Sequence, residues 1–272
     1  MKLIDFDKHF SDFWVEYFRS HRDEYDFVEE FEDDITEIYD IFLDTPAPWL
    51  DNKKPKEYFS GFFDPKELVD GISEYIAEDI PVPELLLTRI VELQKASESP
   101  LLSLLDETHS MHERMISVTL LREIGSEAPL KRYIGWIVKG EPRELVDNCL
   151  ESLDLYAENL ESDLLSALPL AGDEGKQVLL SLLSRFNFSD EVFSALMDLF
   201  ERLPKCRAEL SSYIGRMGNE KALPALKEAA LDENTGYLDY IEIRNAIETL
   251  GGEAPKRTFD ESDPAYEIFK DE

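Results

Sequence analysis

The sequence is poor in cysteine and has no long apolar runs. Only two cysteines occur among 272 residues, Cys149 and Cys206, without C-x-x-C spacing and without a nearby histidine. Two free thiols suit a reducing compartment. No apolar run approaches the roughly 20 residues that a membrane-spanning helix needs. Acidic residues also interrupt the first segment, MKLIDFDKHF, where a secretory signal would require an apolar stretch. We therefore expect a cytoplasmic protein.

Basic residues are scarce as well. The 28 lysines and arginines stand against 60 aspartates and glutamates, which gives a formal net charge of -32. Such a charge repels nucleic acid and anionic membranes and attracts basic macromolecules. No lysine or arginine occurs from Asp23 through Asn52, a stretch that is either a solvated face or a docking surface for a basic partner. We expect a basic protein partner, with no nucleic-acid partner and no membrane partner.

Recognisable catalytic signatures and strand patterns are also missing. The sequence contains no Gly-rich phosphate loop, no Gly-x-Ser-x-Gly elbow and no spaced Ser/His/Asp set. Pairs of carboxylates carry little information in so acidic a chain. Because apolar residues recur at helical rather than alternating spacing, the sequence predicts an all-α protein. We expect it to be non-enzymatic and to use no cofactor.

The second half of the chain contains a five-fold recurrence. In each copy an apolar helical stripe ends at a small or polar residue, and a second helix begins at once. The last apolar residue before each break forms an anchor column with spacings of 32, 30, 31 and 33 residues: Ile124, Tyr156, Phe186, Met217 and Leu250. A period of this length is typical of helical solenoids, in which each unit buries its apolar face against its neighbours. The sequence thus predicts about five helix pairs over residues 98–252.

Columns within the second helices predict which face is buried. The position three residues before the anchor is always apolar and forms the expected core seam: Leu121, Leu153, Leu183, Ile214 and Ile247. The positions two and five residues before the anchor hold no large apolar side chain, and the helical period places them together on the opposite face. We predict that this polar stripe binds the partner through Arg122, Glu151, Asp154, Ser184, Ser212, Asn245 and Glu248.

Residues 1–97 are expected to form a helical cap on the repeat array. Aromatic residues recur at helical spacing between Phe6 and Phe18, and a second apolar stripe is predicted at Phe27, Phe31, Ile35, Ile38 and Phe42. Prolines interrupt residues 45–63, where Trp49 is expected to insert its ring into the body of the protein. Residues 253–272 are expected to form a C-terminal tail.

The last two repeats resemble HEAT-like repeats, in the short form found in phycobilin-lyase-like proteins. The resemblance rests on IGRMGNEKALPALKEAALDENTGYLDYIEIRNAIETLGGEAP, with its Ile-Gly pair, its Ala-Leu-Pro-x-Leu segment, Asp232 in the turn, and Arg244 with Ala246 in the second helix. The segment LLREIGSEAPLKRYI matches too, whereas the repeats around Tyr156 and Phe186 keep only the spacing and the apolar columns. The resemblance implies an α-α superhelix that presents an extended surface to a protein partner. Fold alone does not identify that partner.

Two segments suggest metal chemistry. HSMHE places His109, His112 and Glu113 on one helical turn, and two histidines with a carboxylate can form a facial metal triad. The other interpretation is a polar helix start. DENTGYLDYIE is similar to a calcium-binding loop, but its glycine stands at position five instead of six and Ile243 replaces the final glutamate. We interpret it as a turn in which Asn234 and Gly236 supply left-handed conformations.

The sequence therefore predicts a scaffold or adaptor without enzymatic activity, which presents an acidic helical-repeat surface to a basic protein. Two alternatives remain at this point. One is a metal-dependent enzyme built on His109, His112 and Glu113. The other is an acidic nucleic-acid mimic that blocks a basic protein.

Overall fold

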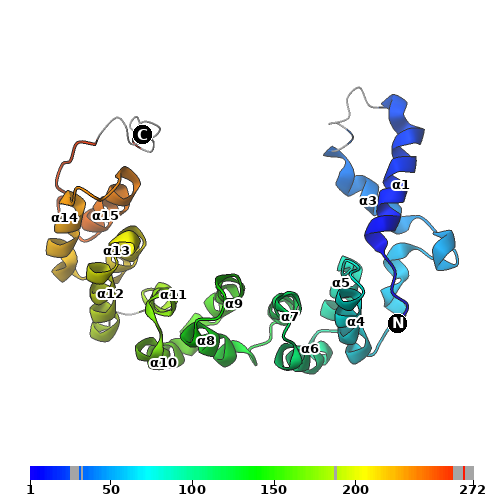
Figure 1. Ribbon diagram of the computed structural model, residues 1–272, viewed down its shortest axis with the longest axis horizontal. Helices are drawn as coiled ribbons and strands as arrows, with labels where there is room; N and C mark the ends of the chain where they lie inside the picture. Colours follow the sequence, from blue (N-terminus) through cyan, green and yellow to red (C-terminus); the bar gives the residue numbers. More distant parts are fainter. Residues whose placement is uncertain (25–30, 32, 187–188, 260–265, 267–272) are drawn as a thin grey trace. The chain divides into compact units, whose positions relative to one another are not determined.

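The computed structural model describes residues 1–24, 31, 33–186, 189–259 and 266. Within these residues the protein is all-helical (Figure 1), which confirms the predicted class. A single isolated antiparallel bridge, between Ala47 and Lys53, is the only β-type pairing in the same part of the chain. The arrangement of the helices as a solenoid superhelix stays a prediction.

The chain divides into two compact units, Met1–Pro129 (unit 1) and Leu130–Glu272 (unit 2). The boundary between the two units, after Pro129, differs from the domain boundary between residues 97 and 98 that the repeat pattern predicts. The expected capping role of residues 1–97 and the domain limits derived from the repeats stay predictions. Each unit is described by itself.

Unit 1 begins with α1 (Phe6–His21) and α3 (Ile35–Asp44), whose aromatic faces pack together. Phe10 contacts Tyr39 at a ring-centroid distance of 4.9 Å and Phe42 at 5.4 Å. Of the predicted second stripe, Phe31, Ile38 and Phe42 are buried, whereas Ile35 is largely exposed. Phe27 lies outside the described residues.

Three short 3₁₀ turns follow α3 and carry the chain through the proline-rich segment: Pro48–Leu50, Pro55–Glu57 and Phe59–Gly61. Four helices then complete unit 1: α4 (Pro65–Ala77), α5 (Glu84–Glu92), α6 (Lys95–Glu107) and α7 (Met111–Glu123). The start of α4 follows from its sequence, because Pro65 occupies the first turn and the side chain of Asp64 accepts a hydrogen bond from the Lys66 amide.

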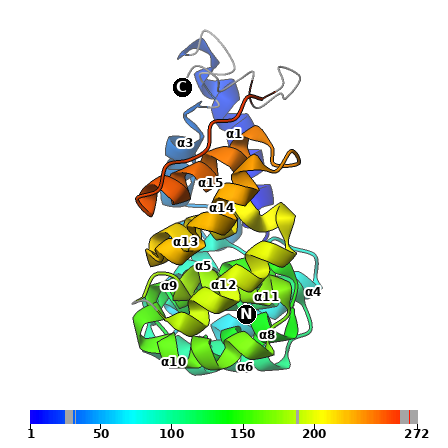
Figure 2. The ribbon, with the colours of Figure 1, turned by 90° about the vertical axis from the view of Figure 1, so that its left-hand side faces the viewer.

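Unit 2 consists of short helices joined by tight turns. In chain order they are α8 (Leu130–Lys139), α9 (Arg143–Leu155), α10 (Ala157–Ala167), α11 (Asp173–Leu183), α12 (Asp190–Arg202), α13 (Arg207–Met217), α14 (Leu223–Leu231) and α15 (Tyr237–Thr249). Successive helices pack in pairs, α8 with α9, α10 with α11, α12 with α13 and α14 with α15. In unit 1, α6 packs with α7 in the same way. Figures 1 and 2 also place α13 beside α15.

The five residues of the predicted core seam are all buried, as the repeat alignment requires. The anchor column is less uniform, since Met217 and Leu250 are buried but the three earlier anchors are half-buried. Glycine terminates the second helix where the repeat motif is strongest. Gly218, for example, caps α13 with φ 71°, a left-handed conformation in which a side chain is disfavoured.

The described part of the C-terminal tail lies against α15. The Tyr240 hydroxyl donates a hydrogen bond to the Pro255 carbonyl oxygen at 2.9 Å, and the Arg257 guanidinium donates to the Glu233 carbonyl oxygen at 3.0 Å. The ring of Phe259 contacts those of Tyr237 and Tyr240 at about 5 Å. These contacts lie on one face of α15.

Candidate functional site

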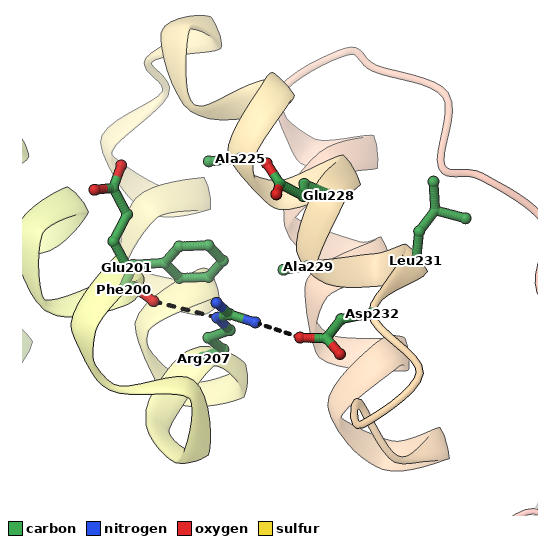
Figure 3. Close-up of a pocket in the computed structure, with 8 residues that line it drawn as sticks. All are labelled: Phe200, Glu201, Arg207, Ala225, Glu228, Ala229, Leu231 and Asp232. Atoms are coloured by element: carbon green, nitrogen blue, oxygen red, sulfur yellow. Dashed lines mark hydrogen bonds and ion pairs between the residues drawn. The ribbon is translucent and has the colours of Figure 1, made fainter.

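A hollow of about 580 Å³ lies between α12 and α14 in unit 2 (Figure 3). It joins the first helices of two consecutive repeats, and we call it the α12–α14 groove. Its lining residues are Phe200, Glu201, Arg207, Ala225, Glu228, Ala229, Leu231 and Asp232. All of them belong to unit 2.

The shape of the groove follows from the two helix sequences. Phe200 points inward from α12 and is buried, while its neighbour Glu201 is exposed. On α14, Ala225 and Ala229 stand one turn apart and present only methyl groups. Larger side chains at these two positions would fill the space between the helices. The hollow therefore depends on small residues at that spacing.

Arg207 forms the floor of the groove and connects three segments (Figure 3). Its Nε donates to the Phe200 carbonyl oxygen at 3.3 Å, and its Nη1 donates to Asp232 Oδ2 at 3.0 Å. The guanidinium carbon also lies 5.6 Å from the centroid of the Phe200 ring. One arginine thus links the end of α12, the start of α13 and the turn after α14.

The carboxylate of Asp232 is held ionised by its own turn. The backbone amide of Asn234, then its side-chain amide, and then Arg207 lower the pKa of Asp232. Both Asn234 nitrogens lie 3.0 Å from Asp232 Oδ1. The expectation that Asn234 and Gly236 are left-handed is wrong. Asn234 is not among the described residues with positive φ, and Gly236 has φ -67° and serves as the N-cap of α15. The side chain of Asp232 shapes the turn instead.

The rim of the groove is acidic and partly apolar. Glu201 on α12 and Glu228 on α14 are exposed, and Leu231, which is 56% exposed, lies at the end of α14 (Figure 3). The lining holds three carboxylates, Glu201, Glu228 and Asp232, and one cation, Arg207, which leaves an excess of two negative charges. The groove therefore combines the apolar side chains of Phe200, Ala225 and Ala229 with an excess of acidic side chains.

The groove was not predicted from the sequence, because the predicted binding stripe came from columns of the second helix in each repeat. The groove residues lie mainly on the first helices, α12 and α14. A usable signal was present: Leu231 stands next to Asp232 at the end of a helix whose inner face is alanine-rich.

The predicted polar stripe is only partly exposed. Glu151, Asp154, Asn245 and Glu248 are exposed, Arg122 and Ser212 are half-buried, and Ser184 is buried at 1% exposure. Arg122 belongs to unit 1 and the other stripe residues to unit 2.

Two stripe residues are engaged by the following repeat. Asp154 forms an ion pair with Arg185, and Ser184 Oγ accepts a hydrogen bond from Arg216 Nη1 at 3.2 Å. Glu248 pairs within α15, where Arg244 Nε donates to its Oε1 at 2.8 Å. The role of the stripe in partner binding stays a prediction. Ser184, however, does not offer its side chain to the surface.

The residues of the predicted metal alternative form a helix start. Ser110 is the N-cap of α7 and accepts a hydrogen bond from the Glu113 amide, while the Glu113 carboxylate accepts one from the Thr108 hydroxyl. The contact from the Glu113 amide to Ser110 is the first half of a capping box, but the Ser110 amide donates to the Thr108 hydroxyl at 2.9 Å instead of to Glu113. His109 and His112 are exposed. Across the described residues, no three His, Cys, Asp or Glu side chains are placed to hold a metal ion.

Other features of the sequence have simple structural outcomes. Cys149 is buried and Cys206 half-buried, and both are free thiols. In the described ranges no helix combines the length and the apolar character that crossing a membrane requires.

Comparison with protein-family models, with curated proteins and with solved structures finds no match for this chain. The resemblance of the last two repeats to HEAT-like repeats therefore rests on the quoted residues alone.

Proposed function

We propose that this protein is a non-enzymatic, cytoplasmic adaptor whose HEAT-like repeat array binds a basic segment of a protein partner in the α12–α14 groove. The observation that carries the proposal is the excess of carboxylates around the apolar side chains of the groove, with Leu231 exposed at the end of α14. A groove that combines apolar side chains with excess carboxylates offers complementary contacts to a basic segment that also carries an apolar side chain.

The groove suits a lysine or arginine followed by an apolar residue. The aliphatic part of a basic side chain would pack against Ala225 and Ala229, and its charged end would lie between Glu201 and Glu228. An adjacent apolar side chain would cover Leu231. Exposed ion pairs contribute about 0.2–1 kcal/mol each, so burial of the apolar groups has to supply much of the affinity.

The exposed stripe residues Glu151, Asn245 and Glu248 are proposed as additional contacts along the second helices. The net charge of -32 favours association with a basic partner from a distance. Raising the salt concentration should therefore slow association more than it speeds dissociation.

Site-specific photo-crosslinking tests the groove. Leu231→benzoylphenylalanine is introduced into the full chain and irradiated in cell lysate, with Leu170→benzoylphenylalanine as the control, because Leu170 is also an exposed leucine of unit 2. We expect one defined adduct from position 231 and none of the same mass from position 170. Adding Glu201→Gln and Glu228→Gln should reduce its yield by roughly 2- to 30-fold. Identical adducts from both positions would exclude the groove as the binding site.

The same adduct separates the adaptor from the nucleic-acid mimic. A mimic would occupy the DNA- or RNA-binding surface of its partner, so added duplex DNA or RNA should abolish the adduct at low salt. If the protein is an adaptor that binds a basic segment outside that surface, the adduct should still form in the presence of DNA or RNA. Elemental analysis of the purified protein addresses the metal-dependent alternative, which requires stoichiometric iron, zinc or manganese.

A further inference from the structure

A second groove lies in unit 1, between α1 and the loop that follows α3. Its cavity volume is about 330 Å³. Flat apolar side chains make up much of its lining, together with one carboxylate and one imidazole: Phe13, Phe42, Pro46, Pro48, Trp49, Asp12 and His9. We call it the aromatic groove. It is independent of the α12–α14 groove, since all its residues belong to unit 1.

The indole of Trp49 is held in place by neighbouring rings. His9 stacks on it at a centroid distance of 3.8 Å and an interplanar angle of 4°, and Phe6 meets it edge-on at 5.9 Å. Phe42 adds a third ring at 6.4 Å. Trp49 nevertheless stays half-buried, so part of its surface faces the groove.

The loop that carries the two prolines is fixed by its own hydrogen bonds. The Ala47 amide donates to the Lys53 carbonyl oxygen at 3.0 Å, and the Asn52 amide donates to the Ala47 carbonyl oxygen at 2.9 Å. Asp44 accepts from Lys54 at 2.7 Å and pairs with Lys56 at 2.6 Å, at the base of the loop. A loop with this many internal bonds is already ordered, so a ligand need not pay to order it.

The chemistry of the lining selects the ligand. Aromatic and proline faces arranged around a shallow groove bind segments in the polyproline II conformation, because such segments present rigid apolar ridges and lose little entropy. Asp12 is exposed at the rim, and no lysine or arginine is among the described residues that line the groove. Burial lowers the pKa of His9, the other titratable side chain of the lining, so a positive charge on the ligand is favoured there. The acidic character of the whole chain acts in the same direction.

We propose that the aromatic groove of unit 1 binds a proline-rich protein segment that carries a basic residue. The prolines pack against Phe13, Trp49 and the loop prolines, and the basic residue pairs with Asp12. This gives the adaptor a binding surface for a second kind of segment, one defined by backbone conformation as well as by charge.

Three fluorescein-labelled peptides test the proposal by anisotropy with the full chain. One consists of repeated Pro-Pro-Arg units. The second, of Pro-Pro-Gln units, keeps the conformation and loses the charge, and the third, of Gly-Ser-Arg units, keeps the charge and loses the conformation. We expect saturable binding that is strongest for the Pro-Pro-Arg peptide. No binding up to about 1 mM, or equal binding of the Gly-Ser-Arg peptide, would overturn the proposal.

Variants of the chain locate the binding. Asp12→Asn should weaken binding of the Pro-Pro-Arg peptide by roughly 2- to 5-fold and leave the Pro-Pro-Gln peptide unchanged. Asp7→Asn is the matched control, because it removes the same charge from an exposed position of α1 outside the groove. Phe13→Ala should weaken both proline-rich peptides, with folding checked by circular dichroism. Equal effects of Asp12→Asn and Asp7→Asn would reduce the interaction to general charge attraction and refute the groove.

Discussion

Arg216 on α13 donates a hydrogen bond from Nη1 to Ser184 Oγ, 3.2 Å away at the C-terminal cap of α11. Arg185 makes a corresponding contact with Asp154 on α9. In both cases an arginine just before the anchor residue of one repeat bonds to the stripe position of the preceding repeat. The middle of the polar stripe therefore holds neighbouring repeats together.

This relationship predicts a measurable coupling between Asp154 and Arg185. A double-mutant cycle with Asp154→Asn and Arg185→Gln, followed by urea unfolding, should give about 0.2–1 kcal/mol of interaction at low salt, because both side chains are partly exposed. The coupling should shrink as salt rises. Strictly additive effects of the two substitutions at low salt would show that the contact does not stabilise the repeat junction.

Two leucines at the end of α9 should respond very differently to truncation. Leu153 is fully buried in the core seam, whereas Leu155 is 68% exposed. Leu153→Ala should lower the free energy of unfolding by about 2–5 kcal/mol, since it removes buried apolar area and leaves a cavity. Leu155→Ala should change it by no more than about 0.5 kcal/mol. Chemical denaturation of both variants measures the two changes. Similar losses of unfolding free energy would contradict the assignment of Leu153 to the core seam.

Two glycines within helices provide a second matched pair. A Cβ at Gly175 on α11 would lie 2.7 Å from the Ile137 carbonyl oxygen of α8, so the backbone would have to move. Gly175→Ala should cost about 1–3 kcal/mol. A Cβ at Gly135 on α8 meets no atom within 4 Å. Gly135→Ala should instead stabilise by about 0.5–1 kcal/mol through helix propensity. If both substitutions stabilise the protein, α8 and α11 are not packed closely enough at Gly175 to exclude a methyl group.

His9 should make the stability of unit 1 depend on pH. Desolvation by burial is the main cause that lowers the pKa of His9, while Asp12 and Asp5 oppose the shift. The unfolded chain then binds more protons than the folded chain as the pH falls below the ordinary histidine pKa of about 6.5, so this contribution to stability is present above that pH and is lost below it. His9→Phe should make the melting temperature depend less on pH between about pH 7 and 5.

The control for this prediction is His109→Phe, at an exposed histidine that the structure places just before α7. It should leave the pH profile unchanged. A profile that is the same in wild type and in His9→Phe would show that His9 is not desolvated in solution.

The core seam was predictable from the sequence because it depends on helical periodicity alone. Leu121, Leu153, Leu183, Ile214 and Ile247 recur at the repeat period, and any packing of these helices must bury the apolar side of each one. The all-α class and the helix start at Asp64 follow from equally local rules. Pairing of each second helix with the helix before it also needs only a short connection.

The candidate sites depended on contacts between residues that are distant in the chain. No local rule brings Glu201 and Glu228 to the lining of one hollow, or stacks His9 on Trp49, because both arrangements arise from packing between helices and loops. Contacts distant in the chain also explain Ser184. Its polarity and its place in the repeat predicted an exposed side chain, but it is buried and accepts a hydrogen bond from Arg216 of the next repeat. Sequence periodicity determined which face of each helix is apolar, and only the tertiary structure decided which polar side chains remain available at the surface.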